Sequence, residues 1–145
     1  MSTQNYKNHR QMVPLYHYVL YLIVFACLGL SIKYAYNAFM VTHYDRKMAA
    51  LLLGLSSGLL LITFFARSFA LKAQDRGIRA EENLRHFMLT GKPLDSRLRI
   101  SQIVALRFAE DSEFLILADR AAADNMKSED IKKAIINWRE DKHRV

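Results

Sequence analysis

Glu82 and His86 are the residues whose types and spacing come closest to a chemical site in this chain. Four positions apart, they share one face of a helix, where a carboxylate and an imidazole can chelate a divalent ion. Glu81 and Asp75 lie nearby in the sequence. A helical di-metal site, however, needs several inward carboxylates and two Glu-x-x-His motifs. The preferred interpretation is a solvated ion-pair network, with Glu81 paired to Arg85, and no metal or other cofactor is predicted.

His17 is the second candidate, because it lies in an apolar segment where ionisable groups are rare and usually functional. Haem held between helices normally takes two axial histidines, and His43 belongs at the far end of the segment. We therefore expect an interfacial histidine beside Tyr16. A membrane redox or metal/haem-binding subunit that uses His17 or the Glu82/His86 pair is kept as an alternative function.

Motifs for other chemistry are missing from the sequence. It contains no Gly-rich phosphate loop, nucleophile elbow, Cys-x-x-Cys pair or His-Glu-x-x-His motif. Its single cysteine, Cys27, excludes a disulfide within the chain. We assign no catalytic residue and expect a non-enzymatic protein.

Two long uncharged runs must position these residues, namely "LYHYVLYLIVFACLGLSI" (15–32) and "MAALLLGLSSGLLLITFFA" (48–66). At about 1.5 Å per residue the second run spans roughly 28 Å, close to the hydrocarbon thickness of a bilayer. The predicted organisation is an N-terminal segment over 1–13, transmembrane helices over 14–41 and 48–69, and a short extracytoplasmic turn over 42–47. The two spans then form an antiparallel hairpin.

The distribution of basic residues predicts the orientation of this hairpin. Seven basic residues flank the side of the two termini, against Lys33, Arg46 and Lys47 on the side of the turn. Both termini are therefore expected in the cytoplasm, with the spans in the inner (cytoplasmic) membrane. Five of the seven follow the second apolar run, and the first four of these could hold anionic lipid head groups, which makes a lipid-binding membrane regulator a further alternative. These four are Arg67, Lys72, Arg76 and Arg79.

Small residues repeat along one face of the second span: Ala50, Gly54 and Gly58, with Ser57 adjacent. Such faces let helix backbones approach closely in lipid. Two interpretations stay open. The face packs on the first span of the same chain, near Ala26 and Gly29, or it joins two protomers or a larger membrane partner.

The second span is predicted to continue as a helical stalk over 70–90. An apolar stripe repeats every three or four residues through this segment, at Phe69, Ala73, Gly77, Ala80, Leu84 and Phe87. Gly91 is expected to cap the helix near Thr90, and Pro93 prevents its continuation. We expect Ala80, Leu84 and Phe87 to face the helical module that follows.

Residues 91–145 are predicted to form a small helical module. The expected buried positions of its first helix are Leu98, Ile100, Ile103, Val104, Leu106 and Phe108. Those of the next helix are Phe114, Leu115, Leu117, Ala118, Ala121 and Ala122, with Asn125 at its end. Ser128 is expected to cap a last helix, whose buried stripe is Ile131, Ala134, Ile135 and Trp138.

Three stretches resemble the cytoplasmic half of an uncharacterised bacterial membrane family, catalogued as a domain of unknown function with two spans near the N-terminus. They are "QDRGIRAEENLRHFMLTGKPLD", "QIVALRFAEDSEF" and "IKKAIINWREDKHRV". The resemblance covers nearly the whole chain. It implies two spans and a helical tail, and it supplies no activity, cofactor or residue role.

The sequence thus predicts an all-α membrane protein: a two-helix transmembrane hairpin whose second span continues as a long helix into a small cytoplasmic helical bundle. Its expected function is that of a scaffold or accessory subunit whose module binds protein. Glu81, Glu82, Arg85 and His86 are the candidate docking surface. The expected partners are the lipid bilayer and either a second copy or another membrane protein. The acidic stretch at 110–113 and the nearly neutral charge of the tail as a whole argue against nucleic acid. No small-molecule substrate is indicated.

Overall fold

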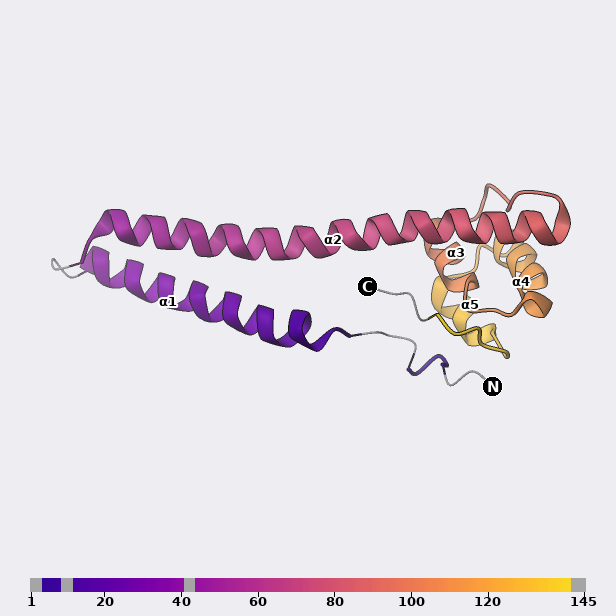
Figure 1. Ribbon diagram of the computed structural model, residues 1–145, viewed down its shortest axis with the longest axis horizontal. Coiled ribbons are helices and arrows are strands. Elements are labelled where there is room, and N and C mark those ends of the chain that lie inside the picture. Colours follow the sequence, from indigo (N-terminus) through magenta and orange to yellow (C-terminus); the bar gives the residue numbers. More distant parts are fainter. Residues whose placement is uncertain (1–3, 9–11, 41–43, 142–145) are drawn as a thin grey trace. The chain divides into compact units, whose positions relative to one another are not determined.

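The computed structural model describes residues 4–8, 12–40 and 44–141, and their regular structure is helical, as predicted. The elements are a stretch of π-helix, η1 (Leu15–Leu20), and five α-helices, α1 (Tyr21–Met40), α2 (Arg46–Thr90), α3 (Ile100–Leu106), α4 (Asp111–Ala123) and α5 (Ser128–Ala134) (Figure 1). The chain divides into two compact units, residues 12–70 and residues 1–11 with 71–145.

The apolar N-terminal helix of the 12–70 unit is formed by η1 and α1 together. It runs from Leu15 to Met40, and with α2 it is one of two helices long and apolar enough to cross a membrane. Pro14 precedes it with φ −58° and ψ −43°, the backbone conformation of a first helical residue. Its missing N–H would have no partner at a helix start in any case.

The start of α2 is fixed by an acidic cap. Asp45 accepts a hydrogen bond from the backbone N–H of Lys47 through Oδ1, at 2.8 Å, which satisfies one of the free N–H groups of the first turn. Within the predicted turn over 42–47, residues 42 and 43 lie outside the described residues. Arg46 then donates from Nε to the Ala38 carbonyl of α1, at 3.3 Å.

Small side chains form the apolar contact of this unit. Ala35, Ala38 and Ala49 make a buried cluster. Ser56 and Thr63 are also buried, and with Ala49 they are spaced by seven residues, so they lie along one face of α2. Near the other end of the contact, the Tyr16 hydroxyl donates to the Thr63 carbonyl at 2.5 Å.

The C-terminal end of α2 has the geometry that the sequence predicts. The helix ends at Thr90, and Gly91 adopts a left-handed conformation with φ 71°. The Gly91 N–H donates to the Phe87 carbonyl at 2.7 Å, which is the single backbone bond of an αL cap. Glycine is favoured here because a side chain would strain this backbone conformation.

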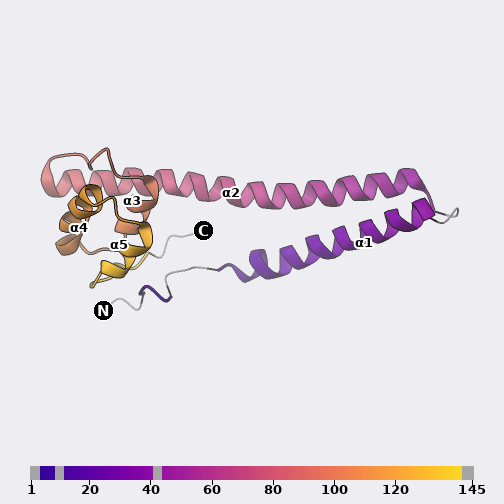
Figure 2. The ribbon, with the colours of Figure 1, turned by 180° about the vertical axis from the view of Figure 1, so that it is seen from behind.

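The helices α3, α4 and α5 gather around the C-terminal part of α2 (Figures 1 and 2). The end of α4 follows the expectation for Asn125, which has φ 47°. The Met126 N–H reaches back to the Ala121 carbonyl at 3.2 Å, the long bond of a Schellman motif. The predicted Ser128 cap is displaced by one residue, because Ser128 is the first residue of α5 and Lys127 precedes it with extended backbone.

The core of the 71–145 unit consists of large apolar side chains from all three small helices and the segments between them. Phe108, Phe114, Leu106 and Ile131 are among the largest fully buried side chains. Trp138 packs on Phe108 with ring centroids 5.1 Å apart. Of the positions expected to be buried, Ile100 is 40% exposed, because it begins α3 on the side away from this core.

The face of α2 that meets the small helices is the reverse of the prediction. Leu84 and Phe87 are 59% and 52% exposed and Ala80 is exposed, whereas Ile78 and Glu82 are buried. An apolar period identifies a helix face but does not say which partner covers it. Here α3 to α5 pack on the opposite face, where one isoleucine and a set of satisfied ion pairs replace the apolar stripe.

Candidate functional site

Arg85 of α2 is the centre of an ion-pair network in the 71–145 unit. Its Nη1 lies 3.0 Å from Glu82 Oε2, and its Nε donates to Asp111 Oδ1 at 2.7 Å. Its Nη2 donates to the Ala109 carbonyl at 2.8 Å. The guanidinium also lies over the Phe114 ring, 4.3 Å from the centroid. A planar fork of fixed donors suits such a set of simultaneous acceptors, which lysine could not satisfy.

Burial makes this network sensitive to the loss of one partner. The Glu82 side chain is 7% exposed and that of Arg85 is 11% exposed. A second guanidinium approaches from the far end of the module, with Arg139 Nη1 3.9 Å from Glu82 Oε1. A buried charge without its partner is strongly destabilising, so this arrangement is a clamp between α2 and the helices that pack on it.

His86 belongs to the end of α2 and not to a site with Glu82. Its Nδ1 lies 2.7 Å from the Lys92 carbonyl, so this nitrogen carries the proton and donates. Thr90 Oγ1 donates to the His86 carbonyl at 2.8 Å, and the Lys92 N–H donates to Thr90 Oγ1 at 3.1 Å. Imidazole and hydroxyl together close the turn after Thr90.

The predicted docking surface is therefore divided by the structure. Only Glu81 is exposed; Glu82 is buried, and Arg85 and His86 are half-buried. The expected pair of Glu81 with Arg85 is replaced by the pair of Glu82 with Arg85, three residues apart. Among the described residues, no group of three or more His, Cys, Asp or Glu side chains could hold a metal ion.

Two of the hollows that open on this unit differ in the charge of their lining. One, of about 510 Å³, borders the network and is lined by residues of both signs, including Arg85, Asp111 and Arg139. The other, of about 490 Å³, contains Arg76 and Arg79, two of the residues expected to hold lipid head groups. The second hollow is lined by two guanidinium groups and one carboxylate, that of Asp95, so its lining is net positive, whereas the two cations and two carboxylates of the first hollow balance.

The remaining two of the expected lipid-contacting residues lie on either side of the boundary between the units. Arg67 is half-buried in the 12–70 unit, with its guanidinium 5.9 Å from the centroid of the Tyr16 ring. Lys72 is exposed in the other unit. That these four residues hold lipid head groups stays a prediction.

His17 lies in η1 with its side chain half-buried. Its Nδ1 is 3.0 Å from the Val13 carbonyl oxygen and 3.1 Å from the Val13 nitrogen. The Tyr16 ring packs edge-on against it, with centroids 5.3 Å apart. These contacts are with the start of its own helix; both the interfacial placement of His17 and the cofactor alternative stay predictions.

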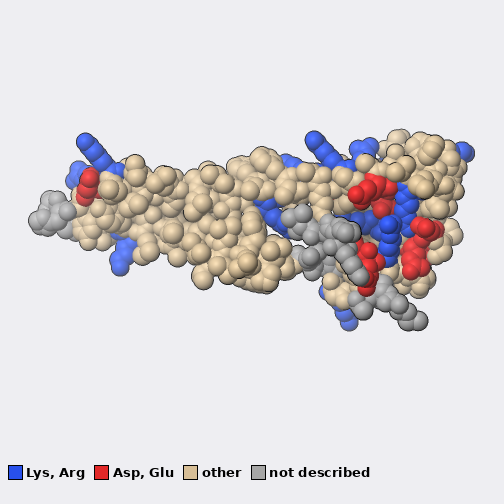
Figure 3. Space-filling model, viewed as in Figure 1, with Lys and Arg blue, Asp and Glu red and all other residues tan. Residues whose placement is uncertain are grey.

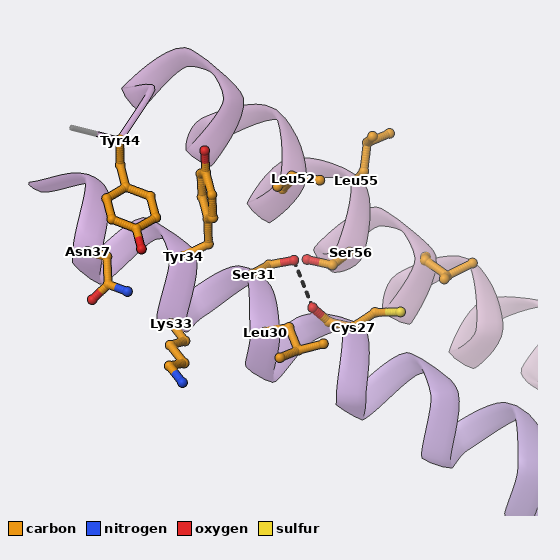
Figure 4. Close-up of a pocket in the computed structure, with 11 residues that line it drawn as sticks. Cys27, Leu30, Ser31, Lys33, Tyr34, Asn37, Tyr44, Leu52, Leu55 and Ser56 are labelled. Carbon is orange, nitrogen blue, oxygen red and sulfur yellow. Dashed lines mark hydrogen bonds between the residues drawn. The ribbon is translucent and has the colours of Figure 1, made fainter.

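A groove of about 630 Å³ lies between α1 and α2 in the 12–70 unit (Figure 4). Cys27, Leu52 and Leu55 line its apolar part, and Tyr34 and Tyr44 line its end near the start of α2. Ser31 and Ser56 point toward one another across the contact, and the Ser31 hydroxyl donates to the Cys27 carbonyl at 2.7 Å (Figure 4).

The small-residue face predicted for helix packing does not pack on α1. Ala50 and Gly54 are exposed, and a Cβ added at Gly54 or Gly58 would meet no atom within 4 Å. The contact with α1 uses the face of Ala49 instead. Of the two interpretations that the sequence left open, packing within the chain is therefore wrong, and a contact with another molecule stays a prediction.

Sequence reasoning missed two buried polar residues. Gln102 is 1% exposed; its Oε1 accepts from the Arg99 N–H at 2.7 Å, and its Nε2 donates to the Met126 carbonyl at 2.8 Å. Arg107 is 6% exposed and pairs with Asp141 at 3.1 Å. A glutamine at the third position of a short helix is a capping signal that could have identified Gln102. No local signal distinguishes Arg107 from the exposed arginines.

Comparison with known proteins gives one match. The family model described as a family of unknown function (DUF6526) covers residues 1–145, which confirms the family resemblance found in the sequence. No curated protein matches the chain, and no solved structure does.

Proposed function

The chain belongs to this family of unknown function, DUF6526, and we propose that it is a non-enzymatic, two-span membrane protein whose helical module binds protein. Its role would be that of a scaffold or an accessory subunit. The single observation that carries the proposal is the inverted burial of the 12–70 unit, which is suited to lipid and unsuited to water.

Large apolar side chains of this unit point outward, and small or hydroxyl-bearing ones point inward. Leu22, Leu30 and Ile62 are 72%, 68% and 67% exposed, whereas Ala38 and Ala49 are 1% exposed. Most of the surface of this unit carries no charge, while side chains of both signs gather over the 71–145 unit (Figure 3). An apolar surface of this extent is costly in water and is neutral or favourable in hydrocarbon.

A transmembrane hairpin with both termini in the cytoplasm is the arrangement we propose. The contacts of Tyr16 with Thr63 and of Arg46 with Ala38 support the pairing of the two spans. In the 71–145 unit, the Asp141 N–H donates to Gln4 Oε1 at 2.8 Å, which supports placing both ends of the chain on one side. The positive-inside rule favours the cytoplasmic side of a bacterial inner membrane.

Cysteine labelling tests this topology. In a Cys27→Ser background, Lys47→Cys should react with a membrane-impermeant maleimide from outside the cell, and Ser112→Cys should react only after permeabilisation. Lys47 and Ser112 are both exposed in the native chain, so thiols at these positions can react without unfolding of the protein. Equal labelling of the two cysteines in intact cells, or release of the chain from membranes by alkaline carbonate, would overturn the two-span arrangement.

The proposal that the module binds protein is supported by the apolar side chains at its surface. The buried ionic groups Glu82 and Arg85 hold the unit together, while Ile116 and Ile136 are 73% and 83% exposed at its surface. Crosslinking in native membranes followed by mild extraction should yield complexes larger than one chain. Recovery of monomer alone, with no co-purifying protein, would contradict this part of the proposal.

A second candidate function, recognition of anionic lipid, is favoured by the hollow that contains Arg76 and Arg79. Each basic residue near an anionic membrane surface contributes about 1 kcal/mol to binding. Anionic lipid added to the full chain in neutral detergent should raise its melting temperature, and Arg76→Gln/Arg79→Gln should remove the rise. An equal rise in the double variant would exclude these two residues as the lipid site.

A further inference from the structure

The exposed apolar face of α2 between Leu71 and Thr90 repeats with the spacing of a coiled-coil seam. Its members are Ala73, Gly77, Ala80, Leu84 and Phe87, separated by four, three, four and three residues. This alternation is the heptad pattern of d and a positions, which keeps one helix face turned toward a partner helix. All five residues are exposed, and we call this set the heptad face.

The other side of α2 in this unit is already occupied. Ile78 and Glu82, at heptad positions b and f, are buried against the small helices, and Arg85 at b is half-buried there. Leu84 and Phe87 of the heptad face lie away from the small helices, whereas Gly77 and Ala80 border hollows that residues of the helical module also line. No described residue of the 71–145 unit buries the heptad face, although Leu84 and Phe87 are large enough to drive association when covered.

We propose that a second copy of the chain covers the heptad face, in a parallel two-stranded coiled coil with two-fold symmetry. This inference rests on the proposed function, because two copies inserted into one membrane in the same orientation must run their α2 helices in the same direction. A closed two-fold interface also uses the same patch on both copies, as a self-complementary seam does.

Charge complementarity supports both the partner and its direction. Arg76 takes a g position and Glu81 the e position five residues later, and both are exposed. In a parallel coiled coil, a g residue lies beside the e residue of the following heptad on the other helix. Arg76 of one copy therefore meets Glu81 of the other, and symmetry makes this pair twice. An antiparallel pairing would instead bring g positions together and set Arg76 beside Asn83, without the acidic partner that the parallel pairing provides.

The small residues at the membrane-proximal end of the seam let the two backbones approach closely. A Cβ added at Gly77 would meet no atom of its own chain within 4 Å. Glycine costs about 1 kcal/mol in a helix relative to alanine, so its place here needs a reason that the single chain does not provide. A partner helix provides one, and confinement of both copies to a membrane raises their effective concentration enough for a short seam.

Disulfide trapping in native membranes tests the seam with a matched pair of variants. In the full-length Cys27→Ser chain, Leu84→Cys places thiols at facing a positions, where Cα atoms come close enough for a disulfide. Leu89→Cys lies on the same helix at an f position and is also exposed in the native chain, at 42%. Mild oxidation should give about ten times more crosslinked dimer from Leu84→Cys than from Leu89→Cys.

Charge exchange tests the direction of the helices. Added to Leu84→Cys, Arg76→Glu should reduce crosslinking roughly tenfold. The new glutamate at position 76 of each copy then lies beside Glu81 of the other copy, which gives two repulsive pairs in the dimer. Arg76→Glu/Glu81→Arg should restore it to within about twofold. Failure of the double exchange to restore crosslinking, or equal crosslinking of Leu84→Cys and Leu89→Cys, would overturn the seam.

Two further measurements keep the inference distinct from the proposed function. Light scattering on the unmodified chain in detergent should give the protein mass of two copies, and Leu84→Glu should reduce it to one while the helix content stays unchanged, because a charge would be buried at an a position of the seam. Carbonate extraction of the same samples reports membrane insertion separately. A membrane-inserted chain with the mass of one copy would overturn the seam alone, whereas a released chain would overturn the two-span proposal.

Discussion

The two units of this chain bury opposite kinds of side chain. In the 71–145 unit, Phe108 and Phe114 are at most 1% exposed and pack with other large apolar residues. Among the residues that the structure describes in the 12–70 unit, every buried one except Val24 is an alanine, a serine or a threonine. These buried residues are Ser31, Ala35, Ala38, Ala49, Ser56 and Thr63.

The difference teaches which solvent each unit is built for. In water, burial of large apolar side chains is the main favourable contribution to folding. In lipid that contribution is absent between helices, and close approach of small residues takes its place. The buried hydroxyls follow the same logic, since Thr63 Oγ1 donates to the Leu59 carbonyl of its own helix at 2.9 Å and needs no water.

The largest expected effect comes from exchanging a phenylalanine for alanine in each unit. Phe114→Ala should lower the free energy of unfolding of the 71–145 unit by about 3–5 kcal/mol, because it removes a fully buried ring. Phe64→Ala, at a residue that is 57% exposed, should change the free energy of unfolding of the 12–70 unit by no more than about 0.5 kcal/mol. Trp138, the single tryptophan, reports unfolding of the 71–145 unit by fluorescence in denaturant, and circular dichroism in detergent reports unfolding of the 12–70 unit. Equal costs would remove the contrast between the units.

Removal of the central guanidinium is expected to rank second. Arg85→Ala leaves the buried Glu82 carboxylate with only the more distant Arg139, and should cost about 3 kcal/mol in the same fluorescence assay. Arg97→Ala is the control, because the Arg97 side chain is 68% exposed and surface pairs contribute at most about 1 kcal/mol. A small loss for Arg85→Ala would mean that apolar packing alone attaches the small helices to α2.

A pair of neighbouring alanines sharpens the comparison within the 12–70 unit. Ala49 is 1% exposed at the contact with α1, and Ala50 is exposed beside it. Ala49→Leu should cost about 1–3 kcal/mol by overpacking, whereas Ala50→Leu should be nearly neutral within the single chain. Thermal unfolding in detergent, followed by circular dichroism, measures both. A large cost only for Ala50→Leu would place the main helix contact on the face of Gly54.

The helical elements and the C-terminal ends of α2 and α4 were predictable from the sequence because their signals are local, whereas α5 ends at Ala134, before the predicted positions Ile135 and Trp138. The apolar period of α2, the left-handed conformations at Gly91 and Asn125, and the apolar stripes of α4 all act within a few residues. The family resemblance is confirmed as well. What the sequence could show of the candidate site was the set of charged residues around Glu82, without their partners.

The faces were not predictable, because they depend on residues distant in the chain. Glu82 and Arg85 looked solvated, since Ala109 and Asp111, which complete the network, lie more than 20 positions away. Similarly, glycines at Gly54 and Gly58 marked a face suited to close packing, and nothing in the sequence showed that Ala49 would be used instead. Periodicity defines a surface, and only tertiary contacts define what covers it.

The smallest effect should come from the exposed ion pair of Asp95 and Arg97, the opposite extreme to Arg85. Hydrogen bonds from Arg97, at 2.6 Å from Nη2 to Asp95 Oδ2, lower the pKa of the Asp95 carboxyl from 3.8 to about 2. The folded state thus holds this carboxylate more strongly than the unfolded state does. The resulting stabilisation is complete above pH 3.8 and is lost as the pH falls toward 2. Carboxyl ¹³C titration of the full chain in detergent should show a midpoint near 2, and Arg97→Ala should return it toward 3.8; an unchanged midpoint would show that Arg97 does not hold the carboxylate.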